Sequence, residues 1–140
     1  KMNYQEIMVK YTKLVIERIY YREDFKIYFD NYLFDSEERW FCGENNIQTE
    51  NSITYNGTIY SEDELYEGAW NTIVHEVTHI ETLGHEDKFW KAYYRNWGMV
   101  DDLRIKFNVE VGWDADFIYD YEDDEEHKDS YDFYLEAFEK

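Results

Sequence analysis

Three of the four histidines in this chain fall within eleven residues, in the segment HEVTHIETLGH at 75–85. His75 and His79 are four residues apart, so on a helix they project from the same face, one turn above the other. This spacing lets both imidazoles reach one metal ion at about 2.0–2.1 Å. The segment therefore constrains the fold: it predicts a helix through His75 and His79 and a change of chain direction before His85.

A third ligand requires the helix to stop. His85 lies six residues beyond His79, too far along to continue the same face. Gly84 offers a stop, because glycine readily takes the left-handed conformation that ends many helices. We expect the helix to end at about Leu83, and His75, His79 and His85 to hold one Zn²⁺ per chain without another cofactor. Three imidazoles also bind Co²⁺ or Mn²⁺, so the spacing leaves the native metal open.

Glu76 stands one position after His75, about 100° further round the helix. This position is poor for a ligand to the same ion, but it suits a base that acts on a water at the open coordination position. The predicted chemistry is hydrolysis, in which Glu76 takes a proton from the attacking water and passes it to the leaving nitrogen. The alternatives for Glu76 are a surface carboxylate and an outer-shell partner of a structural metal. Fifteen tyrosines leave the residue that would stabilise the oxyanion open.

Length, charge and cysteine content limit the setting of such a site. With 140 residues, we expect residues 1–140 to form a single domain. The formal charge of −19 would repel nucleic-acid phosphates, and the basic residues are scattered, so a protein or peptide substrate, or a basic protein partner, is expected instead. The lone Cys42 cannot form an internal disulfide, which favours a reducing, cytoplasmic location. No apolar run is long enough to span a bilayer, so we expect no membrane partner.

The first half of the chain predicts a helix followed by strands. Apolar residues at helical spacing over 4–20 predict an amphipathic helix. Aromatic and β-branched residues in DFKIYFDNYLFD, 24–35, are typical of a strand, and the polar stretch 36–52 is typical of a loop. ITYNGTIY at 53–60 predicts a hairpin with a type I′ turn at Asn56-Gly57, or alternatively one edge strand with a bulge.

The second half predicts two helices, a strand and an acidic segment. Ser61 and Glu64 form a capping-box pattern, so the helix that carries the histidines is expected to begin just after Ser61. Alternating apolar residues at 105–113 predict a strand. Residues 114–140 hold twelve acidic residues against two lysines, a net charge of −10. Between the histidine helix and the strand at 105–113, a shorter helix is expected to end at Gly98. It is expected to place five aromatic side chains in the core rather than along a cleft: Phe89, Trp90, Tyr93, Tyr94 and Trp97.

The stretch TIVHEVTHIETLGHEDKFWKAY, residues 72–93, resembles the zincin metallopeptidases of the SprT-like, WLM and YgjP-like groups. Those groups share HExxH, a third His about six residues on, and an aromatic pair on the next helix. The resemblance implies a zinc-dependent peptidase with a small α+β zincin-like fold, in which the active-site helix packs on a short antiparallel or mixed sheet. The matching residues here are His75, Glu76, His79 and His85, followed by Phe89 and Trp90.

Two other families share the histidine spacing. Metzincins have HExxHxxGxxH, and this chain has Thr82 in place of their glycine. YbeY-like endoribonucleases have HGxxHxxxxxH, and Glu76 replaces that glycine, which favours a peptidase. A function from a different class is also open: a non-catalytic, zinc-containing binding protein that acts through its acidic surface on a basic partner.

Overall fold

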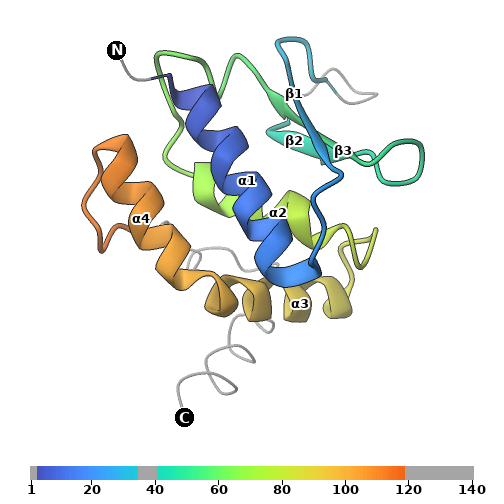
Figure 1. The fold of residues 1–140 in the computed structure, drawn as a ribbon. Coiled ribbons are helices and arrows are strands. Elements are labelled where there is room, and N and C mark those ends of the chain that lie inside the picture. The colour runs from blue at the N-terminus through green and yellow to red at the C-terminus, as the bar shows by residue number, and fades with distance from the viewer. Residues whose placement is uncertain (1–2, 35–40, 119–140) are drawn as a thin grey trace.

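The structure, a computed structural model, describes residues 3–34 and 41–118, so most of the acidic segment 114–140 lies outside it. The described chain is an α+β domain with four helices and a three-stranded mixed sheet, which confirms the predicted fold class. Figure 1 shows the strands gathered on one side of the first two helices, with the last helix on the other. The elements are α1 (Tyr4–Tyr20), β1 (Lys26–Asp30), β2 (Gly43–Asn45), β3 (Ser52–Asn56), α2 (Ala69–Thr78), α3 (Asp87–Met99) and α4 (Asp101–Val111).

Helix α1 has the bounds that the sequence predicts. The Asn3 side chain caps it by accepting a hydrogen bond from the backbone N–H of Glu6. It ends at Tyr20, and the next residue, the C-cap Tyr21, has a left-handed φ of 55°. The buried face contacts α2, α3 and α4, so α1 forms one wall of the core. That face consists of Ile7, Met8, Tyr11, Thr12, Val15, Ile16 and Ile19.

The sheet differs from the one predicted. β3 is the central strand, parallel to β1 and antiparallel to β2, and all five of its residues are buried. β1 is shorter than the predicted strand at 24–35, and β2 forms inside the stretch predicted as loop.

Both predictions for ITYNGTIY, a hairpin and an edge strand with a bulge, are wrong. β3 ends at Asn56 and pairs with strands from elsewhere in the chain. Asn56 and Gly57 are both described, and neither has a positive φ, so the type I′ turn is absent there. Instead, the Asn56 side chain accepts hydrogen bonds from the backbone N–H groups of Thr58 and Ile59, at 2.9 and 3.2 Å. The turn is therefore stabilised by the Asn56 side chain, whereas the prediction relied on a positive-φ backbone conformation.

Helix α2 begins at Ala69, so the predicted start just after Ser61 is also wrong. The capping-box bond does form, because the Glu64 N–H donates to Ser61 Oγ at 2.9 Å. No helix follows Ser61 directly, however, because Tyr60 and Leu65 pair in an isolated antiparallel bridge that makes 60–65 a turn. A local capping signal is therefore overridden by a strand-like contact of the buried Tyr60.

The segment 105–113 is helical, not the predicted strand. In α4, Ile105 and Val109 are exposed, and they account for half of the apparent alternation. The helix ends at Gly112, whose φ is +88°. α3 confirms the predicted second helix, extended by one residue past Gly98. The hydrophobic residues that α4 buries lie four apart, as one helical face requires: Leu103, Phe107 and Val111.

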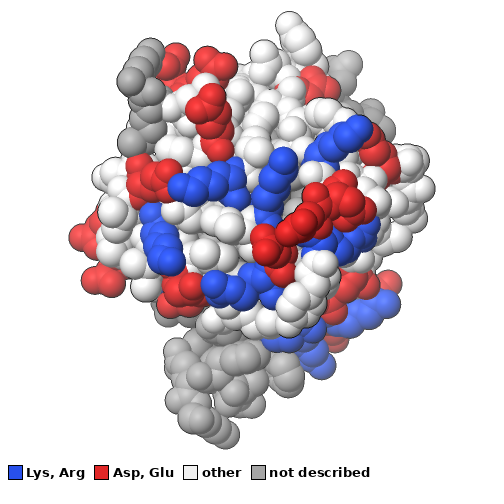
Figure 2. Space-filling view, viewed as in Figure 1, with Lys and Arg blue, Asp and Glu red and all other residues white. Residues whose placement is uncertain are grey.

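The outer face of α1 and α4 carries both signs of charge. Figure 2 shows Lys and Arg side chains interleaved with Asp and Glu side chains on this face. Two ion pairs join the helices: Lys10 with Glu110 at 3.0 Å and Arg18 with Asp102 at 2.8 Å. Of the helices in the described ranges, none combines the length and apolar character that a membrane crossing needs.

Candidate metal centre

Helix α2 contains His75, and His79 is the residue that follows its last turn. It contacts α1, α3 and β2, and nine of its ten residues are buried. The helix ends at Thr78, but His79 keeps a right-handed conformation, with φ −62° and ψ −9°. His79 therefore stays on the same face as His75, and their ring centroids are 4.9 Å apart.

The path from α2 to His85 differs from the predicted one. The helix ends at Thr78 rather than at about Leu83, and Gly84, which is described, has no positive φ. Instead, the hydrogen bonds after Thr78 join residues three apart. The N–H of Ile80 donates to the carbonyl of Val77, and the N–H of Glu81 donates to the carbonyl of Thr78, both at 3.0 Å. With these short-range bonds, the helix ends about five residues earlier than predicted.

The three histidines converge all the same. His75 Nε2 lies 3.0 Å from His85 Nε2 and 3.2 Å from His79 Nε2, and the third separation is 3.1 Å. Three nitrogens on one tetrahedral Zn²⁺ at about 2.0–2.1 Å would be separated by about 3.3 Å. The observed spacings are slightly smaller, so the donor set fits one small cation after a minor expansion.

The hydrogen bond of His79 fixes the state of its ring. His79 Nδ1 lies 2.9 Å from the carbonyl oxygen of Thr82, which can only accept, so Nδ1 carries the hydrogen. In the neutral ring, Nε2 then presents its lone pair to the other two histidines. Burial of the ring lowers the pKa of His79, and the nearby His85 lowers it further, against the opposing effect of the Thr82 carbonyl. These features favour the neutral form that binds metals.

Helix α3 supports the histidines from the other side. The Phe89 ring stacks on His79, with centroids 4.4 Å apart, and the Trp90 ring stacks on His85 at 5.9 Å. Trp90 Nε1 also donates to the backbone carbonyl of His85 at 2.9 Å. All five aromatic residues predicted for the core are buried, as expected.

Glu76 lies on the side of α2 that packs against β2. Only 5% of the residue is exposed, which excludes the surface-carboxylate alternative. Asn45 Nδ2 donates to the backbone carbonyl of Glu76 at 2.7 Å. A Cβ added at Gly43 would lie 3.3 Å from Glu76 Cγ, so the glycine lets the strand approach the carboxylate closely. Glu76, His75 and His85 all line one cavity of about 460 Å³.

The environment of Glu76 suits a group that accepts and releases a proton. Burial, and to a smaller extent the neighbouring Glu44, raise the pKa of Glu76 to about 8. A divalent cation held by the histidines would act in the opposite direction and favour the carboxylate. Glu76 is thus a carboxyl group whose protonation depends on what the histidines bind.

Three residues of the site were not predicted from the sequence. Asn71 lines the cavity and lies four residues before His75, so reading the histidine face one turn further back would have found it. Gly43 is one of six glycines, and nothing in the sequence marks it. Thr82 acts through its carbonyl, a group that every residue has.

Comparison of the chain with family models, with curated proteins and with solved structures found no match.

Proposed function

We propose that this protein is a zinc-dependent peptidase, a hydrolase in which His75, His79 and His85 hold one Zn²⁺ and Glu76 is the general base. One observation carries the proposal: three histidine Nε2 atoms lie within 3.0–3.2 Å of one another beside a cavity that a buried glutamate also lines. The Thr82 carbonyl on His79 adds support, because metal-binding histidines commonly carry such a partner.

The proposed reaction is hydrolysis of a peptide bond. Zinc bound at the histidines would polarise the scissile carbonyl and acidify the attacking water. Glu76 accepts one proton from that water as the new C–O bond forms, and donates it to the nitrogen as the C–N bond breaks. Because Glu76 is buried, its carboxylate is poorly hydrated and therefore basic enough to take the proton.

Charge and cysteine content guide the choice of substrate and setting. The net charge of −19 favours a protein or peptide substrate over a nucleic acid. The lone Cys42 fits a reducing compartment such as the cytoplasm. A non-catalytic zinc-containing binding protein is the less favoured function, because an outer-shell role for the buried Glu76 would not require the cavity that it lines.

The test starts with metal content. Protein purified without chelator should contain about one zinc per chain, and His79→Ala should lose it. Glu76→Gln should keep zinc and thermal stability but lose hydrolysis of an unfolded protein such as casein, by at least about a hundredfold. The exposed Glu67→Gln is the matched control and should cleave like the wild type.

Two results would overturn the proposal. Absence of zinc in the wild type, even after zinc is offered at neutral pH, would mean that the histidines are not ligands. Wild-type cleavage by Glu76→Gln would remove the general base and leave zinc in a structural role.

A further inference from the structure

Asn71 has a buried carboxamide without a hydrogen-bond partner. The residue is 4% exposed, and neither its Nδ2 nor its Oδ1 is bonded to any of residues 3–34 and 41–118. Buried amide groups in folded proteins are normally paired, because leaving them unpaired costs stability. Asn96 shows the usual case: its amide binds Tyr20 and Thr78, and its oxygen accepts from Arg95. Among the described residues, Asn71 is the one side chain with two such unpaired atoms, which makes it a candidate for ligand binding.

The position of Asn71 indicates what that function is. Asn71 lies one helical turn before His75 on α2 and lines the same cavity as His75 and Glu76. The next residue, Thr72, also lines the cavity, but its hydroxyl is already bonded to the Tyr60 hydroxyl at 2.7 Å. Asn71 is thus a residue beside the proposed reaction centre whose two hydrogen-bonding atoms are enclosed and bind none of the described residues.

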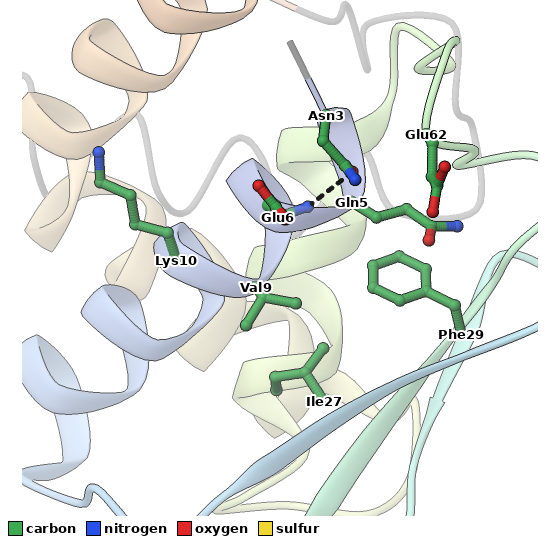
Figure 3. A pocket seen from close by; sticks show the side chains of 8 residues that line it. All are labelled: Asn3, Gln5, Glu6, Val9, Lys10, Ile27, Phe29 and Glu62. Carbon is green, nitrogen blue, oxygen red and sulfur yellow. Dashed lines mark hydrogen bonds between the residues drawn. The ribbon is translucent and has the colours of Figure 1, made fainter. Parts of the chain in front are cut away.

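A second hollow, between α1 and β1, gives the contrast. Figure 3 shows it with an apolar floor of Val9, Ile27 and Phe29, and it has a volume of about 510 Å³. Its amide groups are engaged: Asn3 Oδ1 accepts from the Glu6 N–H, and Gln5 Nε2 donates to the Tyr60 carbonyl. None of the described residues that line this hollow carries a buried, unpaired polar group like the one that marks the cavity at Asn71.

We propose that Asn71 binds the substrate: its enclosed carboxamide turns toward the cavity and pairs with a peptide group of the chain being cleaved. Nδ2 donates to a substrate carbonyl and Oδ1 accepts from a substrate N–H, which together match a neutral, planar amide. This inference rests on the proposed peptidase function and specifies its substrate.

The cavity also selects against a charged chain end. Among the described residues that line it there is no Lys or Arg, so a terminal carboxylate would find no counter-charge there. We therefore expect cleavage at internal peptide bonds rather than removal of a C-terminal residue.

The test uses the full-length, zinc-loaded protein and two probes. Acetohydroxamic acid carries only a metal-binding group, whereas the hydroxamate of N-acetyl-leucyl-glycine adds peptide groups to it. Asn71→Leu removes both polar atoms at similar volume, and Asn71→Ala removes them without risk of crowding. Asn96→Leu is the matched control, since it deletes a buried carboxamide that is fully bonded. Dissociation constants, zinc per chain and the thermal midpoint are measured for each variant.

Asn71→Leu should keep its zinc, bind acetohydroxamic acid like the wild type and bind the peptide hydroxamate about tenfold more weakly. Its thermal midpoint should equal or exceed that of the wild type, because an unpaired amide has been removed, whereas Asn96→Leu should melt earlier.

Three results would overturn the inference, and they differ from one another. Equal binding of the peptide hydroxamate by wild type and both Asn71 variants would show that Asn71 does not touch the substrate. Earlier melting of both Asn71 variants would assign the residue to the fold. A zinc-loaded wild type that binds neither probe, or a wild type without zinc, would refute the peptidase function itself, and the inference with it.

Discussion

At the scale of single residues, Gly43 determines how much space the Glu76 side chain has. Gly43 has no side chain, and a Cβ there would lie 3.1 Å from the Thr54 carbonyl oxygen, 3.1 Å from Tyr55 Cδ1 and 3.3 Å from Glu76 Cγ. Two of these neighbours belong to the central strand and cannot move freely. The space for the Glu76 carboxylate therefore depends on the absence of one carbon atom on β2.

Gly43→Ala tests this dependence. We expect stability to fall by about 1–3 kcal/mol through overpacking, and peptide hydrolysis to fall by at least about tenfold as Glu76 is displaced. Zinc content should not change, because the three atoms nearest to a Cβ at Gly43 do not belong to any of the three histidines. Gly84→Ala is the control, since its nearest neighbour, Glu86 Cγ, is 3.9 Å away. Equal activity of the two variants would contradict this account of Gly43.

At the scale of elements, the site depends on how α3 meets the turn after α2. Trp90 binds the His85 carbonyl, and Phe89 stacks on His79, so two adjacent residues of α3 position two different histidines. The end of α2 is bonded as well: Asn96 Nδ2 donates to Thr78 Oγ1 and to the Tyr20 hydroxyl, both at 3.0 Å. Helices α1 and α3 thus hold the place where α2 stops.

Trp90→Phe should weaken zinc binding. The substitution keeps an aromatic ring near His85 but removes the bond to the His85 backbone, so the third ligand loses its anchor. Loss of such outer partners typically costs about 10–100-fold in metal affinity. Competition with a chromogenic chelator measures the dissociation constant, and Trp113→Phe, at a tryptophan that packs on Phe107, serves as the control. If both variants bound zinc equally well, the Trp90 bond would have no part in holding the site.

Elements were predictable where local spacing agrees with packing. The helix at 4–20 and the convergence of the three histidines follow from residues close in sequence, which is why the sequence sufficed for both. The segment 105–113 misled because Ile105 and Val109 mimic a strand alternation while facing solvent. Ser61 misled because its cap is real but closes a turn. The role of Asn71 depends on partners that are absent, and no sequence pattern records that.

For the molecule as a whole, α1 and α4 are joined by charged contacts on one face. The Tyr11 hydroxyl donates to Glu110 at 2.6 Å, and Lys10 adds an ion pair to the same carboxylate. The hydrogen bond from Tyr11 lowers the pKa of Glu110, and Lys10 lowers it further, against a smaller opposing effect of burial. A single carboxylate thus ties both helices together through two partners.

The stability conferred by Glu110 should depend on pH in a defined direction. A carboxyl group with a depressed pKa stabilises the fold at pH values above its unfolded pKa of about 4.3, and this contribution disappears as the pH falls through the folded pKa. Glu110→Gln should therefore melt below the wild type at pH 7, and the gap should close at acidic pH. The loss should stay under about 1 kcal/mol, because the pair is solvent-exposed. A gap that widened on acidification would reverse the sign and contradict the assignment.

Metal removal should act on the whole fold. Zinc that binds only the folded protein stabilises it by about 4 kcal/mol when its free concentration is a thousandfold above the dissociation constant. Chelator treatment should lower the thermal midpoint, and added zinc should restore it. His79→Ala should show neither change. A midpoint insensitive to chelator in the wild type would mean that no metal is bound by the native state.

The three histidines are close together in the sequence, whereas the residues that surround Glu76 come from distant parts of the chain. All three histidines lie within eleven residues, whereas Asn45, which donates to the Glu76 carbonyl, lies 31 residues before Glu76. Short loops close at low entropic cost, and long-range pairing is slower. A refolding chain should therefore take up zinc before it gains activity, which a zinc-sensitive dye and a peptide substrate can time together. During synthesis, such an order would keep a metal-loaded but unfinished chain from cutting its neighbours.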